Sequence, residues 1–513
     1  SVSLTGVSKT LNVSGATSIY AGSITSSGAQ RYAGAVSLVS DTSVTTTNAN
    51  LTFESTLNSA TSTAKGLTIS TGSGAVSFGA AVGNIYGLGA TSISAGSVAA
   101  TSTLSIASTA SITTTTSGTG TQTYTGAVTL GGTSSFTSSN SNITFSSTLN
   151  SLTSARSVTI AAGTGTVTFA GAVGGVLALG ATTITAGTLN VSDDFYTSGT
   201  TTINASSMQT AATKAFSVIS GASATLNVDS LVVGAAMTGS AGGTLTIQPR
   251  TSTTTIGLGS SASGTLNLDD TELAYINGKF GALVIGSSSG TGAVAVNYGS
   301  TFTYTQPLTL RTASAGSIAA VDTLNTGSNA LTISSGTISL VDVVSGELAV
   351  TGASGITLNG NVTTAGSQTY TGATTLGTSV MLDTTTGLSA GRGILFAGTG
   401  TIAGTTANAQ ALTINAGTVG TIQVNGAIGS TTTLSSLTVT HSGGARFIGA
   451  VSVDTSIVLT NTVSGAVVSF EGGLSTPVLT TTSNPYGISL TGSNNSITTS
   501  IEFLNTGSLA LGN

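Results

Sequence analysis

The sequence repeats one long stretch almost verbatim, and such a repeat restricts a chain to folds that stack one unit many times. The first copy contains L-T-F-E-S-T-L-N from Leu51 and G-L-T-I-S-T-G-S-G-A-V-S-F from Gly66. The second copy contains I-T-F-S-S-T-L-N from Ile143 and S-V-T-I-A-A-G-T-G-T-V-T-F from Ser157. Equivalent positions lie about 92 residues apart, which predicts a repeat protein.

The segments that connect the copies indicate a shorter structural unit. The octapeptide G-A-T-S-I-Y-A-G at Gly15 returns as G-A-T-S-I-S-A-G at Gly89, but the second is followed by about 18 extra residues before the next Q-x-Y motif. An insertion that leaves the later pattern in register indicates one complete turn. Dividing the Gly15 to Gly89 spacing by four, and the longer period by five, predicts a coil of about 18 to 19 residues.

The strand chemistry predicts a β-solenoid. Segments such as 67–69 and 76–78 alternate apolar and hydroxyl residues, which places the apolar side chains on one face. Good helix formers are scarce and β-branched residues are abundant. We predict an all-β fold in which residues 1–513 form one elongated parallel β-helix of about 28 coils. Regular repeats are expected over 1–192, divergent coils over 193–365, and repeats again over 366–513.

The composition supports an ordered chain. Gly alone contributes 70 residues and charged residues are only 5%, but 39% of the residues are hydrophobic, which is enough to bury a core. Cysteine is absent, so neither disulfides nor thiolate metal ligands are available. No stretch approaches the 18 apolar residues of a membrane-spanning helix. Because the sequence starts at Ser1 inside repeat-like sequence, we expect a mature or internal segment of a longer protein.

Candidate chemical groups are few. The adjacent acidic pairs are Asp193 with Asp194 and Asp269 with Asp270, and they are surface candidates for calcium or substrate binding. Neighbouring strand residues point to opposite faces, so each pair is expected to lie in a turn or on the solvated surface. His441 would be a catalytic base only with a partner such as Asp454. We therefore predict no catalytic residues and no cofactor.

The charge balance argues against a nucleic-acid partner. The net charge is −5, the pI is about 4.6, and the basic residues are isolated from one another. The tyrosines Tyr32, Tyr124 and Tyr370 recur in Q-x-Y-x-G, a context typical of turns. They are expected either to pack in the core or to form an exposed platform on which a sugar ring stacks.

The segment G-T-L-N-L-D-D-T-E-L-A-Y-I-N-G-K-F-G-A-L-V-I-G at Gly264 to Gly286 resembles a recurrent segment of filamentous-haemagglutinin-like exoproteins. The blocks A-L-T-I-N-A-G-T and G-S-Q-T-Y-T-G-A resemble repeats of the same class. The resemblance implies a bacterial secreted or surface adhesin with a right-handed parallel β-helix, exported with the help of an outer-membrane secretion partner. The amino-terminal secretion domain of that class is not found in these residues.

These observations predict a non-enzymatic, extracellular structural or adhesive rod that acts as the stalk or shaft of an adhesin at the bacterial cell surface. Its partners would be other copies of itself, or a glycan or protein on a host or neighbouring cell. One alternative is a self-assembling subunit of an extracellular filament, sheath or surface layer. Another is a polysaccharide-active β-helix enzyme, which requires clustered carboxylates on neighbouring coils.

Overall fold

The computed structural model describes residues 1–114, 119–386, 389–398 and 400–512. The chain folds as an all-β parallel solenoid with about 22 residues per coil and about 23 coils, so the predicted fold class is confirmed. The residue contacts divide the chain into two compact units. The first unit comprises Ser1–Arg250 and Ala274–Gly281, and the second comprises Thr251–Leu273 and Ala282–Asn513. The expectation of one uninterrupted stack over 1–513 stays a prediction.

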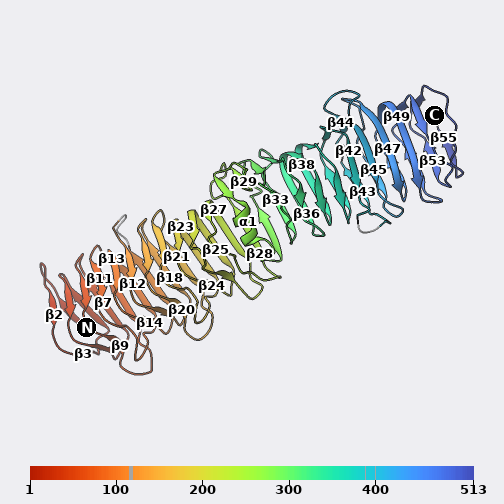
Figure 1. The fold of residues 1–513 in the computed structure, drawn as a ribbon. Helices are drawn as coiled ribbons and strands as arrows, with labels where there is room; N and C mark the ends of the chain where they lie inside the picture. The colour runs from red at the N-terminus through yellow and green to blue at the C-terminus, as the bar shows by residue number, and fades with distance from the viewer. Residues whose placement is uncertain (115–118, 387–388, 399, 513) are drawn as a thin grey trace. The chain divides into compact units, whose positions relative to one another are not determined.

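The coils of the first unit supply strands to three faces, and the strands of successive coils pair in parallel, side by side (Figure 1). Face 1 contains β1 (Val2–Leu4), β4 (Ser23–Ser26), β7 (Thr42–Thr46), β10 (Leu67–Ser70), β12 (Thr91–Ala95), β15 (Ala110–Thr114), β18 (Ser134–Ser138), β21 (Val158–Ala161) and β28 (Thr244–Gln248). Face 2 contains β2 (Leu11–Val13), β5 (Gln30–Tyr32), β8 (Leu51–Phe53), β11 (Ala75–Phe78), β13 (Ser97–Ala100), β16 (Gln122–Tyr124), β19 (Ile143–Phe145) and β22 (Thr166–Phe169).

Three long strands of the first unit run through both face 1 and face 2, and they are β23 (Thr182–Val191), β25 (Thr201–Thr210) and β27 (Ala224–Val232). Face 3 contains β3 (Thr17–Ile19), β6 (Val36–Leu38), β9 (Leu57–Ser59), β14 (Leu104–Ile106), β17 (Val128–Leu130), β20 (Leu149–Ser151), β24 (Phe195–Thr197) and β26 (Phe216–Val218). Single bridges through Val82 and Val173 continue face 3 between these short sheets.

The second unit has the same organisation. Its first ladder contains β31 (Ala282–Ile285), β33 (Leu308–Arg311), β40 (Gln368–Thr371), β43 (Ile394–Ala397), β46 (Ile422–Val424), β48 (Ala445–Phe447), β50 (Val467–Phe470), β53 (Gly487–Leu490) and β55 (Leu509–Leu511). Its second ladder contains β29 (Ile256–Leu258), β32 (Val294–Val296), β34 (Ser317–Ala320), β41 (Thr374–Leu376), β44 (Ile402–Gly404), β51 (Leu474–Thr476) and β54 (Ser496–Ile497).

The strands β36 (Leu331–Leu340) and β38 (Leu348–Leu358) take part in both of these ladders. The third ladder of the second unit contains β35 (Leu324–Asn325), β37 (Val343–Ser345), β39 (Val362–Thr364), β42 (Val380–Asp383), β45 (Ala411–Asn415), β47 (Leu434–Ser442), β49 (Val451–Thr462) and β52 (Val478–Thr480). The long strand β49 also takes part in the second ladder, because Val451 pairs with Leu474 of β51. The strand β30 (Leu266–Leu268) pairs with β29 and leads into α1 (Asp270–Ile276), the one helix among the described residues.

Alternation along each strand builds the core. Leu67 and Ile69 of β10 are buried while Thr68 between them is exposed, as the sequence pattern predicted. In face 2 the same inward position carries an aromatic ring in successive coils. Tyr124, Phe145 and Phe169 stack with ring centroids 4.9 and 5.4 Å apart, close to the spacing between strands. Each coil therefore buries its apolar side chains against the coils on either side.

The coil is longer than the 18 to 19 residues predicted. The face 2 register runs from Tyr32 through Phe53, Phe78 and Ala100 to Tyr124, so the repeated stretch spans four coils and not five. A coil in this stretch therefore averages about 23 residues, and the chain forms about 23 coils instead of about 28.

The error has a structural cause. The octapeptide at Gly15 contributes Thr17–Ile19 to β3 on face 3, where it pairs with Val36–Leu38. The nearly identical octapeptide at Gly89 contributes Thr91–Ala95 to β12 on face 1, where it pairs with Leu67–Ser70. The two copies occupy different faces, so their spacing is not a whole number of coils. A small turn followed by alternating apolar residues satisfies either face equally well.

Replacing a core ring should cost far more than replacing its outward neighbour. We expect Phe145→Ala to lower the free energy of unfolding by about 3–5 kcal/mol, because Phe145 is 1% exposed and stacks on rings of both adjacent coils. The control Thr144→Ala on the same strand should change it by less than about 0.5 kcal/mol. Urea unfolding followed by circular dichroism measures both, and equal effects would contradict this core assignment.

Candidate functional site

The first acidic pair lies between β23 and β24 and braces the next coil. Asp193 Oδ1 lies 2.5 Å from Lys214 Nζ, and Asp194 Oδ1 accepts a hydrogen bond of 2.8 Å from the Ala215 amide. The hydrogen bond from Lys214 lowers the pKa of Asp193 below its usual range. Both carboxylates therefore have partners within the protein.

The second acidic pair begins the helix α1. Asp269 Oδ1 accepts the Glu272 amide at 2.8 Å, and the Asp269 amide donates to Glu272 Oε2 at 3.2 Å, which is a reciprocal helix cap. Asp270 accepts the amides of Ser260 and Gly299, each at 3.1 Å, through its two carboxylate oxygens. These carboxylates hold the helix start and a neighbouring loop in place.

The acidic residues and the histidine of the described part of the chain do not form a metal-binding group. No three His, Cys, Asp or Glu residues lie close enough there to hold a metal ion. His441 on β47 is in register with Asn461, whereas Asp454 follows Val453, the partner of Leu434 at the other end of the strand. His441 and Asp454 are therefore not brought together.

The tyrosines of the Q-x-Y motifs lie in strands and not in turns. Tyr124 is fully buried, and its hydroxyl donates to Gln122 Oε1 at 2.9 Å. Gln122 Nε2 donates to the carbonyls of Ile112 and Thr137 at 3.2 and 2.7 Å. The expectation of an exposed sugar-stacking platform is wrong. Residues two apart on a strand point to the same face, so the Tyr and Gln side chains both point into the core and hydrogen-bond to each other there.

The other two motifs repeat this arrangement. Tyr32 donates to Gln30 Oε1 and Tyr370 donates to Gln368 Oε1, each at 3.0 Å. Burial raises the pKa of Tyr32 to about 12 and raises the pKa of Tyr370 well above its ordinary value, so both hydroxyls stay protonated donors at neutral pH.

The outward side of face 1 carries hydroxyl residues in register. One column takes a single position from each successive coil of the first unit, and every member is Ser or Thr: Ser23, Ser43, Thr68, Ser92, Ser111, Ser135, Thr159, Thr183, Thr202, Thr225 and Thr246. Apart from a bond between Ser135 and Ser111, these hydroxyls have no side-chain partner within the described residues. They are therefore available to water.

A second column lies two residues further along the same strands: Thr25, Thr45, Ser70, Ser94, Thr113, Thr137, Ala161, Thr185, Asn204, Asn227 and Gln248. Its last three members form an amide ladder with bonds of 2.6 and 2.5 Å. The sequence did not reveal either column, because their alignment depends on the correct coil length.

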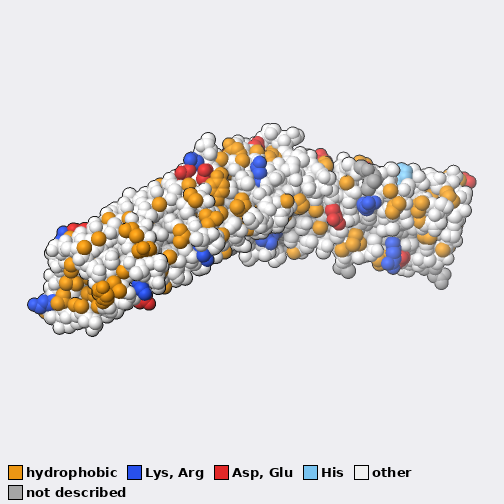
Figure 2. Space-filling model, turned by 90° about the horizontal axis from the view of Figure 1, so that it is seen from below, with side chains coloured by type: hydrophobic (Ala, Val, Ile, Leu, Met, Phe, Trp, Pro, Cys, Tyr) orange, Lys and Arg blue, Asp and Glu red, His pale blue; other side chains and the backbone are white. Residues whose placement is uncertain are grey.

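The corresponding outward column of the second unit is mixed, with Val284, Thr309, Thr332, Ala349, Thr369, Leu395, Gln423 and Arg446. The uninterrupted Ser and Thr column is thus a property of the first unit and does not follow from composition alone. Figure 2 shows few and scattered charged side chains on the face that it presents.

Two cross-coil ion pairs lie next to aromatic residues in the same local arrangement. Arg31 contacts both carboxylate oxygens of Glu54 at 2.6 Å. Arg446 contacts both carboxylate oxygens of Glu471, at 2.6 and 3.0 Å. In each case the Arg precedes a core aromatic residue and the Glu follows the aromatic residue of the next coil. The pairs are solvent-exposed, so each contributes little to stability.

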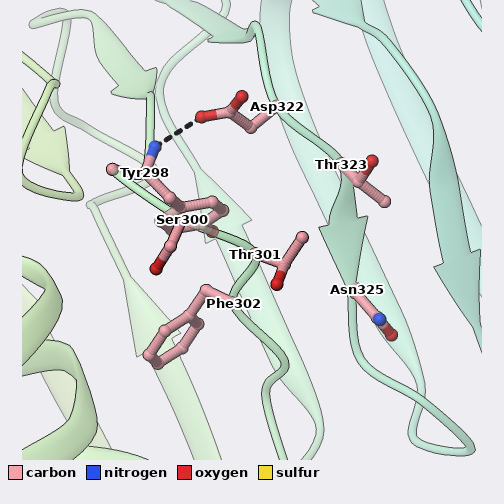
Figure 3. A pocket seen from close by; sticks show the side chains of 8 residues that line it. Tyr298, Ser300, Thr301, Phe302, Asp322, Thr323 and Asn325 are labelled. Atoms are coloured by element: carbon pink, nitrogen blue, oxygen red, sulfur yellow. Dashed lines mark hydrogen bonds between the residues drawn. The ribbon is translucent and has the colours of Figure 1, made fainter.

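A cavity of about 310 Å³ opens in the second unit where a loop interrupts the coil. It is lined by Tyr298, Gly299, Ser300, Thr301, Phe302, Asp322, Thr323 and Asn325. The first five belong to the loop after β32, and the last three lie between β34 and the end of β35 in the next coil. Figure 3 shows these two segments beside each other, with Asp322 joined to the backbone of Tyr298.

Aromatic residues form one wall of this cavity. The rings of Tyr298 and Phe302 are stacked with centroids 5.4 Å apart, and the Tyr298 hydroxyl donates to the Tyr304 hydroxyl at 3.0 Å. Burial is the main cause that raises the pKa of Tyr298, and the nearby carboxylates of Asp322 and Asp270 add to it. Tyr298 therefore stays uncharged, and this wall presents a neutral aromatic surface.

No protein-family model, no curated protein and no solved structure matches the chain. The fold itself defines the class, a β-solenoid repeat protein. Among the described residues, no helix has the length and hydrophobicity needed to cross a lipid bilayer.

Removing one buried tyrosine hydroxyl tests the Gln and Tyr pairing. We expect Tyr124→Phe to lower the free energy of unfolding by about 1–3 kcal/mol, because Gln122 Oε1 loses its donor inside the core. Tyr20→Phe is the matched control, since Tyr20 is 74% exposed, and it should have almost no effect. Calorimetric or urea unfolding measures the difference, and an unchanged Tyr124→Phe variant would refute the pairing.

The pH dependence of stability should include a contribution from Glu471. The Arg446 hydrogen bonds lower the pKa of Glu471 in the folded state. Its stabilising effect is therefore fully present above its unfolded pKa of about 4.3, and it is lost as the pH falls through the lowered folded pKa. Urea midpoints measured from pH 6 to 2 should fall less steeply in Glu471→Gln than in the parent. An unchanged slope in Glu471→Gln would contradict this contribution.

Proposed function

We propose that this protein is a non-enzymatic structural rod of a bacterial surface or secreted protein, which acts outside the cell as a stalk or as the shaft of an adhesin. The stacking of coils supports this proposal, because each coil buries its core against its neighbours and length is gained simply by adding coils. The resemblance of residues 264–286 to filamentous-haemagglutinin-like exoproteins points to the same class.

The observation that carries the proposal is the hydroxyl column from Ser23 to Thr246. A rod exposes a large surface for its core volume, and it must keep that surface soluble without long flexible charged side chains. In-register Ser and Thr residues achieve this, since each hydroxyl faces water on a strand that is paired on both sides. The candidate carboxylates favour the same function, because Asp193, Asp194 and Asp269 support neighbouring segments.

The rod function predicts that the longest dimension of the protein increases with the number of coils. Deleting residues 54–145 removes four coils and joins Phe53 to Ser146, which restores the motif L-T-F-S-S-T-L-N. We expect a folded protein whose longest dimension in small-angle X-ray scattering is shorter by about 19 Å, at about 4.8 Å per coil.

A deletion out of register serves as the control. Removing residues 54–135 joins Phe53 of face 2 to Phe136 of face 1, so we expect this variant to misfold although it is ten residues longer. If the in-register deletion variant kept the longest dimension of the parent, the rod function would be contradicted.

Electron microscopy of the purified full chain separates the rod from an assembly. The stalk proposal predicts isolated thin particles of uniform length. An indefinite filament or an ordered lattice would instead identify a self-assembling subunit of a filament, sheath or surface layer, and would overturn the simple stalk.

A further inference from the structure

The geometry points to a binding site for one uncharged sugar residue in the cavity lined by segments 298–302 and 322–325. This inference goes beyond the rod function and does not depend on it, because a stack of coils needs no cavity between its segments. A sugar site would give the second unit an adhesive role of its own.

The loop that forms the cavity is held in place before any ligand arrives. The amide of Tyr298 donates to Asp322 Oδ2 at 2.5 Å, and the next amide, of Gly299, donates to Asp270 Oδ2 at 3.1 Å. Asp270 is itself tied to the Ser260 amide through its other oxygen. Two carboxylates therefore fix consecutive peptide units, which reduces the entropy that binding must overcome.

The opposite segment keeps polar atoms free for a ligand. Asp322 uses Oδ2 for the Tyr298 amide, and Oδ1 has no partner within the described residues. Asn325 uses its Oδ1 to accept the Gly327 amide at 2.9 Å, which leaves the hydrogens on Nδ2 available. The hydroxyl of Thr323 lies between them in the sequence. One acceptor, one donor and one hydroxyl suit neighbouring sugar hydroxyls, each of which donates and accepts.

The aromatic wall supplies an apolar contact. Phe302 is half-buried, and its ring stacks on Tyr298 and meets Tyr304 edge to face at a centroid distance of 4.9 Å. These contacts hold the ring in one orientation. A pyranose ring has an apolar C–H face and polar hydroxyl edges, so it can pack on Phe302 while its edge bonds to Asp322 and Asn325.

Charge and size restrict the ligand class further. The lining residues include no Lys or Arg, and they include the carboxylate side chain of Asp322, so anionic sugars are disfavoured. The volume of about 310 Å³ is at the lower end of the range for ligand sites, which suits a single ring. A single free carboxylate oxygen is too few ligands for a calcium ion. The chemistry therefore selects one neutral sugar residue, free or within a glycan.

The test titrates the full chain with glucose, galactose, mannose and N-acetylglucosamine, using saturation-transfer NMR and calorimetry. At least one of them should bind with a dissociation constant of about 1–10 mM, as expected for a small polar ligand. Glucuronate and sialic acid should bind more weakly.

Isosteric variants separate ligand binding from loop structure. Asp322→Asn and Asn325→Asp each keep an oxygen for the amide of Tyr298 or Gly327 while changing the free polar group. Each should weaken binding about tenfold or more without loss of fold by circular dichroism. Asp342→Asn is the control, because Asp342 also accepts one backbone amide, that of Asn361, but lies outside the cavity. It should bind as the parent does.

Three results would overturn the site: no binding of any neutral sugar, unchanged affinity in both isosteric variants, or tighter binding of an anionic sugar. None of these results depends on the dimension or the assembly state of the chain. Failure of the sugar site and failure of the rod would therefore be told apart.

Discussion

Backbone hydrogen bonding between successive coils is the interaction on which the rest of each unit depends. The Leu67 amide donates to the Ala90 carbonyl of the next coil at 2.9 Å, and the Glu54 amide donates to the Tyr32 carbonyl of the preceding coil at the same distance. Such bonds fix the separation of coils at the strand spacing and align equivalent residues. Within the strands, each side chain therefore lies next to the side chain at the equivalent position of the neighbouring coil.

Because of this alignment, a residue type that recurs once per coil forms a row of contacting side chains along the stack. Inside, the alignment stacks Tyr124 on Phe145 and lets Gln122 bond to one carbonyl of its own coil and one of the next coil. Outside, it places Arg446 opposite Ser469, where its guanidinium reaches Glu471 of the same neighbouring coil. The same register produces the hydroxyl columns of face 1. Where a loop departs from the ladder, as after β32, the alignment is lost locally and a cavity can form. Variation in the loops thus supplies chemistry that the regular coils lack.

The sequence allowed the local structure to be predicted but not the length of the coil. Alternation at Leu67, Thr68 and Ile69 is a property of two or three neighbouring residues, so it was correctly interpreted. The coil length required the face of each motif to be known, and the octapeptides at Gly15 and Gly89 lie on different faces. Local pattern does not distinguish one inward-facing strand from another, which is why the coil length was wrong.

The all-β class, the alternating core and the scarcity of charge can be predicted from the sequence, because they depend on residue type and on spacing along one strand. The fold was needed to learn that the Q-x-Y tyrosines are buried, that the Ser and Thr residues of face 1 align, and that Asp322 accepts the amide of Tyr298. These features join residues about one coil apart or more. Their positions depend on the register between coils, which the stacking hydrogen bonds set and the linear order of residues does not reveal.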